Sequence, residues 1–168
     1  MRTLNLIYRD WEKYCHFNFD IFSLMLFYSK EIDENISLSL FKCMVSEYDF
    51  KLLRDIPLEG LTPEDENVDI TVSELSVVIA FINNVLIPSL NVDSDNILNK
   101  YGGTEAFVSL FVNETGFTED VFIDNDDFQE ANSDIYTKEN LIYCFNSLKE
   151  FLQYVHSNGL PYDVRVDS

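Results

Sequence analysis

Glycine and proline are scarce in this chain, with five and four residues among 168. Few tight turns are therefore expected, which favours helices. The segment Met1–Asp10 contains two arginines but no following apolar run, so it does not resemble a secretory signal. The longest apolar stretch, Val72 to Leu90, is interrupted by Asn83, Asn84 and Pro88 and falls short of a membrane span. We expect a soluble, cytoplasmic protein that does not contact membranes.

Cysteine and histidine are also few. Cys15, Cys43 and Cys144 form an odd set without a CxxC motif or metal-ligand spacing. We interpret them as three reduced thiols in a reducing cytoplasm. His16 and His156 are the only imidazoles, and no HxxxH or HxH pair exists. The sequence therefore predicts no zinc site and no cofactor.

No motif in the chain specifies a reaction. There is no GxSxG nucleophile motif, and Gly102–Gly103 lacks the lysine of a phosphate-binding loop. The acidic run Asp124–Glu130 suggests calcium, since alternating oxygen ligands suit a hard cation. The EF-hand pattern fails, because Phe128 replaces a ligand, Gln129 replaces the glycine of the sharp turn, and Ile135 replaces the bidentate glutamate. We expect a protein that is not an enzyme and holds no metal.

Positive charge is nearly absent from the middle of the chain. Between Asp55 and Thr137, 18 carboxylates accompany one cation, Lys100, so this block carries 17 of the 19 net negative charges. Like charge costs stability but attracts cations over long distances. Nucleic acid and anionic membranes would be repelled, so a basic protein, a metal cation or a cationic substrate remains as the partner. Of these we predict a basic protein, with no direct contact with nucleic acid.

The hydrophobic composition predicts a folded chain. Hydrophobic residues make up 46%, including 14 phenylalanines and 9 tyrosines. A single domain, residues 1–168, buries about 70% of the surface that its unfolded chain exposes. Apolar residues recur with helical spacing over 4–15, 21–32 and 36–52. We therefore predict a mainly α fold, an irregular helical bundle.

Two later helices have clearer ends. Thr71 and Glu74 form a capping box, and the helix that they begin is apolar nearly all round. We expect it at the centre of the bundle, ending near Ile87 because Pro88 follows. A last helix begins after Thr137 and ends before Gly159.

Other segments leave alternatives open. Residues 17–21 and 36–40 alternate as strands do, which would give an α+β fold with an N-terminal hairpin through 31–35. Residues 104–112 fit either a short helix or a strand. Residues 121–123 resemble a strand and precede a polar loop, so we predict a short β or loop-rich acidic insert near 114–136.

We predict that this insert binds the partner, because loops present binding groups more often than framework helices do. Aromatic rings among carboxylates are typical of protein interfaces, where rings anchor and charges steer. The candidate partner-binding residues are Glu119, Asp120, Phe122, Asp124, Asp126, Asp127, Phe128, Glu130 and Asp134. Residues 59–74 are the alternative surface, through Glu64, Asp65, Glu66 and Asp69.

The chain is small, densely acidic in one zone, free of catalytic motifs and rich in Asn, Ile, Asp, Phe and Tyr. In composition it resembles the immunity proteins of bacterial contact-dependent growth inhibition and related polymorphic toxin systems. The resemblance implies a 1:1 complex that covers the cationic cleft of a cognate toxin domain, often a nuclease. A nucleic-acid mimic of the anti-restriction or anti-CRISPR type is the alternative function. An acidic regulatory subunit is a third.

Overall fold

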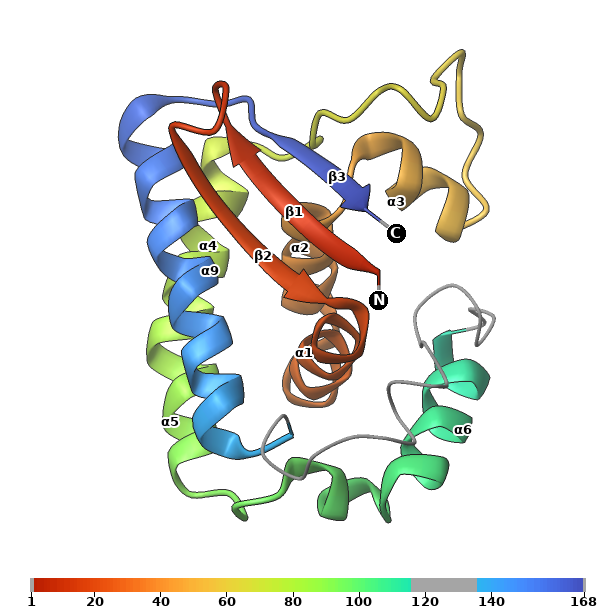
Figure 1. Ribbon diagram of the computed structural model, residues 1–168, viewed down its shortest axis with the longest axis vertical. Coiled ribbons are helices and arrows are strands. Elements are labelled where there is room, and N and C mark those ends of the chain that lie inside the picture. Colours follow the sequence, from red (N-terminus) through yellow and green to blue (C-terminus); the bar gives the residue numbers. More distant parts are fainter. Residues whose placement is uncertain (1, 116–135, 168) are drawn as a thin grey trace.

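The computed structural model describes residues 2–115 and 136–167, which form helices packed against a small sheet (Figure 1). The fold is therefore mainly α with a three-stranded antiparallel sheet of order β2-β1-β3. In chain order the elements are β1 (Thr3–Tyr8), β2 (Lys13–Asn18), α1 (Phe19–Ile32), α2 (Glu34–Met44), α3 (Glu47–Leu53), α4 (Val72–Phe81), the π-helical turn η1 (Ile82–Leu86), α5 (Ile87–Asn91), the 3-10 helix η2 (Ile97–Tyr101), α6 (Thr104–Thr115), α9 (Lys138–Asn158) and β3 (Asp163–Asp167).

Residues 3–18 form an antiparallel hairpin, so the helix predicted there is wrong. The α+β alternative is correct in outline, but the hairpin predicted through 31–35 is wrong, because α1 and α2 meet there. In β1, Leu6 lies opposite Cys15 of β2 and Val164 of β3. Because β3 lies at the far end of the chain, no local pattern could reveal that β1 is a central strand.

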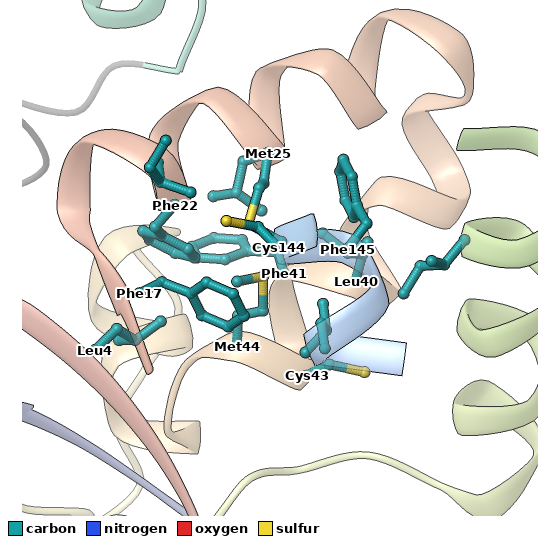
Figure 2. Packing of buried hydrophobic residues seen from close by; sticks show 14 of the residues in the cluster. Leu4, Phe17, Phe22, Met25, Leu40, Phe41, Cys43, Met44, Cys144 and Phe145 are labelled. Carbon is teal, nitrogen blue, oxygen red and sulfur yellow. The ribbon is translucent and has the colours of Figure 1, made fainter. Parts of the chain in front are cut away.

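Helix α1 is the central helix of the molecule. Eleven consecutive residues, from Phe19 to Ser29, are buried. The sheet lies across α1 and α2, and α9 runs alongside (Figure 1). Rings and sulfurs from these elements meet in one core, which includes Phe22, Met25, Phe41 and Phe145 (Figure 2). The single stripe predicted over residues 36–52 is divided into α2 and α3 by Ser46, whose hydroxyl accepts a hydrogen bond from the Asp49 N–H at 3.1 Å.

The capping box is confirmed, but the helix that follows does not occupy the centre. Thr71 Oγ1 accepts from the Glu74 N–H at 3.1 Å, and Glu74 accepts from the Thr71 N–H at 3.3 Å. Leu75, Val78 and Phe81 are buried, whereas the opposite side of α4 faces solvent. The apolar pattern predicts burial all round except at a thin polar edge, yet the structure also exposes apolar side chains, including Val72 and Val77.

Pro88 does not end this helix, contrary to the prediction. In an α-helix its ring would clash with the carbonyl of Asn84. The wider π turn of η1 precedes it, with the Ile87 N–H donating to the Ile82 carbonyl, and α5 continues to Asn91. By length and composition the continuous helix Val72–Asn91 could cross a membrane, so the prediction that this stretch falls short of a span is wrong. In the structure, 28% of its most apolar window is buried against the rest of the protein.

The last helix is confirmed as α9. Thr137 Oγ1 accepts from the Asn140 N–H at 3.2 Å, and Gly159 ends the helix with a φ of 98°. The region that fitted a helix or a strand is the helix α6. The three cysteines are buried free thiols. Burial raises the pKa of Cys15 and Cys144 to about 12, so both stay protonated near neutral pH.

Candidate protein-binding surface

The predicted partner-binding residues of the acidic insert lie outside the residues that the structure describes, as does the strand predicted at 121–123. These residues are Glu119, Asp120, Phe122, Asp124, Asp126, Asp127, Phe128, Glu130 and Asp134. The alternative surface, residues 59–74, lies within the described part.

Ion pairing divides the described carboxylates of the acidic block into two groups. Six of the eleven have a lysine or arginine within 4.0 Å: Glu59, Glu66, Glu74, Asp93, Asp95 and Glu114. The other five have none among the described residues: Asp55, Glu64, Asp65, Asp69 and Glu105. Four of these five lie on one connection, residues 54–70 between α3 and α4, which we call the acidic loop.

The acidic loop leaves α3 through a tightly hydrogen-bonded turn. The Ile56 N–H donates to the Lys51 carbonyl at 2.9 Å, and Asp55 adopts a left-handed backbone with a φ of 55°. Lys51 Nζ lies 2.8 Å from Glu47 and 3.9 Å from Glu59. The hydrogen bond to Glu47 is the main reason that the pKa of Lys51 is raised, with Glu59 and Asp69 contributing.

A second turn fixes the middle of the loop. The Thr62 N–H donates to the Asp65 carboxylate at 2.6 Å, and the Asp65 N–H donates back to the Thr62 carbonyl at 2.9 Å. Before this turn, Glu59 and Gly60 have φ values of 53° and 88°. The loop thus has a defined path outside α3, at the upper right of Figure 1.

The end of the loop is attached to the sheet. The Val68 N–H donates to the Tyr162 carbonyl at 3.2 Å, and the Val164 N–H donates to the Glu66 carbonyl at 2.9 Å. Arg165 pairs with the Glu66 carboxylate at 2.5 Å. Residues 66–68 therefore cover the start of the outer edge of β3, while Glu64, Asp65 and Asp69 stay exposed.

A hollow of mixed character lies beside the acidic loop, with a volume of about 380 Å³, and its lining includes Arg2 and Arg165, the latter paired with Glu66. Loop, α3 and β3 side chains line it, including Pro63, Leu52 and Val166. Leu52 and Val166 are 51% and 46% exposed. Asp49 also lines the hollow; burial raises its pKa, although a hydrogen bond from Ser46 opposes this. Apolar and charged side chains thus lie together in this hollow, as they do in protein interfaces.

The hairpin turn presents a second group of side chains that suits protein contact. Trp11 and Tyr14 are exposed, with ring centroids 5.7 Å apart, and the Arg9 guanidinium lies 5.0 Å from the ring centre of Tyr8. Trp, Tyr and Arg dominate interface hot spots. Sequence reasoning missed these residues because it assigned Trp11 and Tyr14 to a helical core stripe.

A serine and a histidine meet on the surface between α4 and α9. Ser76 Oγ lies 3.0 Å from His156 Nε2. Within the described residues, no carboxylate hydrogen-bonds to the other ring nitrogen. Ser76 also lies inside a helix, where the amide groups bond to helix carbonyls and do not form an oxyanion hole. In the part of the chain that the structure describes, the pair is therefore a surface contact without the other groups that acyl transfer requires.

Metal ligands do not gather in the described residues: no three His, Cys, Asp or Glu side chains there are arranged to hold an ion. Comparison with protein-family models, with curated proteins and with solved structures found no match to the chain. The case for function therefore rests on the physical chemistry of the surface.

Proposed function

We propose that this protein is an immunity-type inhibitor that binds a basic toxin domain, such as a nuclease, through the acidic loop and the hollow beside it. The observation that carries the proposal is the grouping of carboxylates that lack a cation. Asp55, Glu64, Asp65 and Asp69 lie on one ordered loop, although cations elsewhere neutralise most of the other described acids of the block.

The arrangement suits a protein partner in two ways. Exposed like charges attract a cationic surface over long distances and speed association. The exposed Leu52 and Val166 offer apolar contacts that shed water once the partner has docked. The charges that speed association therefore lie next to the apolar side chains that would hold the partner. A toxin bound in this way would be blocked stoichiometrically, without turnover.

The proposal is tested genetically with the gene that directly precedes this one. An immunity gene follows the gene of its secreted toxin, so the C-terminal domain encoded upstream is expressed in cells with and without this protein. We expect growth arrest that this protein relieves. The variant Asp55→Asn/Glu64→Gln/Asp65→Asn/Asp69→Asn should protect poorly.

A matched control removes the same number of exposed carboxylates from other places, as Asp95→Asn/Glu105→Gln/Glu139→Gln/Glu150→Gln. This control should protect as well as the wild type does. Absence of a toxin gene upstream, or full protection by both variants, contradicts the proposal. Competition by DNA for a general DNA-binding protein would instead indicate the nucleic-acid mimic.

A further inference from the structure

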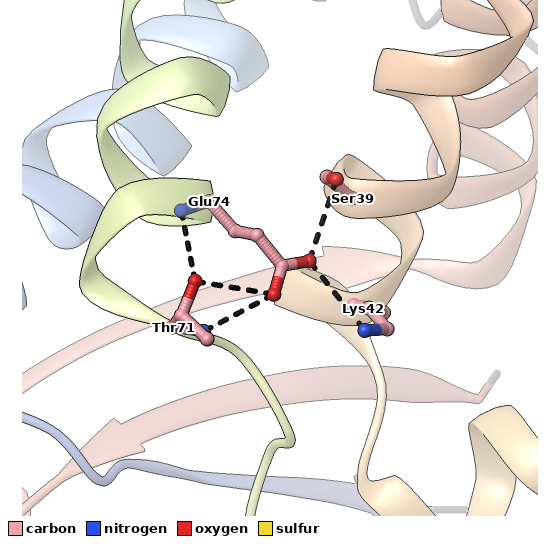
Figure 3. Close-up of polar contacts among 4 residues, drawn as sticks. All are labelled: Ser39, Lys42, Thr71 and Glu74. Carbon is pink, nitrogen blue, oxygen red and sulfur yellow. Dashed lines mark hydrogen bonds and ion pairs between the residues drawn. The ribbon is translucent and has the colours of Figure 1, made fainter.

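The outward side of α4, η1 and α5 carries no exposed charge. From Val72 to Val92 the only ionisable residue is Glu74, which turns toward α2, 3.5 Å from both Lys42 and Ser39 (Figure 3). The exposed residues of this stretch, which we call the neutral face, are Val72, Ser73, Ser76, Val77, Ala80, Asn83, Asn84, Val85, Pro88, Asn91 and Val92.

The neutral face has exposed apolar side chains and a groove beside them. Val72, Val77, Val85 and Val92 are all exposed, Val92 to 88%. A groove of about 520 Å³ runs between α4 and α9 along Ser76, Ile79, Ala80, Asn83, Gln153 and His156. Short side chains such as Ala80 let a second helix backbone approach closely. Lys149 borders the face and donates to Asn83 Oδ1 at 3.2 Å.

The net charge of the chain indicates which partner suits the neutral face. The chain has a net charge of −19, so two copies repel each other wherever their acidic surfaces meet. A basic partner gains nothing from a surface without carboxylates. We propose that the neutral face is the interface of a two-fold symmetric dimer of this chain, because two copies approach there at the smallest electrostatic cost.

The order of side chains along the face suits two-fold symmetry. Val72 and Val77 lie toward one end, Val85 and Val92 toward the other, and Asn83 and Asn84 lie between them. In an antiparallel pair of helices each end meets the opposite end of its partner, so valines meet valines. Asn83 bonds within the chain, donating to Asn84 Oδ1 at 3.1 Å and accepting from Lys149. The Asn84 amide near the axis faces its own copy, to which its N–H groups can donate and from which its Oδ1 can accept a second hydrogen bond.

Lipid suits the neutral face less well, despite the length of the helix. Ser73, Ser76, Asn83, Asn84 and Asn91 would lose water in hydrocarbon without gaining partners. The net charge of −19 also opposes approach to anionic lipids. In Figure 1, α4 and α5 lie at the left edge and the acidic loop at the upper right, so both loops of a dimer stay accessible. The dimer is independent of toxin binding.

Sedimentation of the full chain over a range of concentrations and salt tests the dimer. We expect a monomer–dimer equilibrium that strengthens as salt screens the repulsion, the opposite of binding to a basic partner. Ala80→Glu should raise the dimer dissociation constant at least about tenfold, because it places a carboxylate in the interface. Ser109→Glu, at an exposed position of α6, should leave that constant unchanged.

A cross-linking experiment tests the symmetry. Asn84→Cys should give covalent dimers with a thiol-to-thiol cross-linker, whereas Ser109→Cys should not, since the native thiols are buried. The proposal is overturned by a monomer at every concentration and salt, by equal weakening in Ser109→Glu, or by equal cross-linking at both positions. Binding to neutral phosphatidylcholine vesicles that Ala80→Glu abolishes would identify the face as a membrane surface instead.

Discussion

At the scale of the residue, carboxylates occupy backbone positions that favour glycine. Asp55 and Glu59 adopt left-handed conformations with φ values of 55° and 53°. Such a backbone costs a residue with a Cβ roughly 1–2 kcal/mol. Glu59 is 77% exposed at its side chain, and its contact with Lys51 at 3.9 Å is long. Glycine would relieve this strain at Glu59, whose carboxylate adds little stability in return.

We predict that Glu59→Gly stabilises the protein by about 0.5–1 kcal/mol, because relief of the left-handed strain exceeds the added entropy of the unfolded chain. Urea unfolding measures this change. Glu150→Gly, at an exposed position inside α9, is the matched control and should destabilise by about 1 kcal/mol. Destabilisation of similar size in both variants would contradict the argument from strain.

Asp93 links several elements by its carboxylate. Tyr28 Oη donates to it at 3.0 Å, Lys100 Nζ at 3.2 Å, and the Ser94 N–H at 3.1 Å. Burial raises its pKa, but the hydrogen bonds from Lys100, Ser94 and Tyr28 outweigh this and hold the pKa below its usual value. The same carboxylate raises the pKa of Tyr28, for which burial is the largest cause.

A lowered carboxyl pKa in the folded state gives a stability that depends on pH. The contribution of Asp93 is complete above the pKa of the unfolded chain and is lost as pH falls through the lower folded pKa. We predict that Asp93→Asn costs about 1–2 kcal/mol at pH 7 and that the difference shrinks between about pH 4 and pH 2. Urea unfolding at several pH values checks this. As a control, Asp95→Asn, at a side chain 96% exposed, should have little effect on stability. If Asp93→Asn lowered stability by the same amount at every pH, the charge of Asp93 would not be the cause.

At the scale of the element, the connection between α2 and α4 depends on Glu74. Its carboxylate closes the capping box with Thr71 and also reaches Ser39 and Lys42 of α2 (Figure 3). One side chain thus fixes both the start of α4 and its position against α2.

We predict that Thr71→Ala costs about 1 kcal/mol, and that Thr71→Ala with Glu74→Ala costs less than the sum of the single changes, because each partner satisfies the other. A double-mutant cycle by thermal or urea unfolding measures the coupling. Ser73→Ala, exposed in the same turn, should change stability by less than about 0.5 kcal/mol. Additive costs at Thr71 and Glu74 would show that the two do not act as a unit.

The elements with local signals could be predicted from the sequence, and those defined by distant contacts could not. Thr71 with Glu74, and Thr137 with Gly159, mark helix ends by side-chain chemistry within a few residues. Strand β1 has no such local signal, because its central position in the sheet depends on pairing with β3, more than 150 residues away. For the site, charge counting indicated residues 59–74 as an acidic stretch, but only tertiary structure separates paired Glu66 from Asp55 and Asp69.

At the scale of the whole molecule, the acidic loop and the uncharged neutral face lie on different sides. The acidic loop lies beside α3 and β3, whereas the neutral face follows α4 and α5 (Figure 1). A net charge of −19 makes self-association unfavourable except at the neutral face and makes a cationic partner favourable at the loop. Salt should therefore weaken partner binding and strengthen the dimer.

The most direct test of the acidic loop as binding surface is the association rate with the toxin domain encoded upstream, followed by stopped flow from low to high salt. Steering by charge raises such rates roughly 10- to 1000-fold at low salt. We predict a rate that falls steeply with salt for the wild type and for Asp95→Asn/Glu105→Gln/Glu139→Gln/Glu150→Gln. The loop variant Asp55→Asn/Glu64→Gln/Asp65→Asn/Asp69→Asn should lose most of this dependence. Equal salt dependence in both variants would contradict the account.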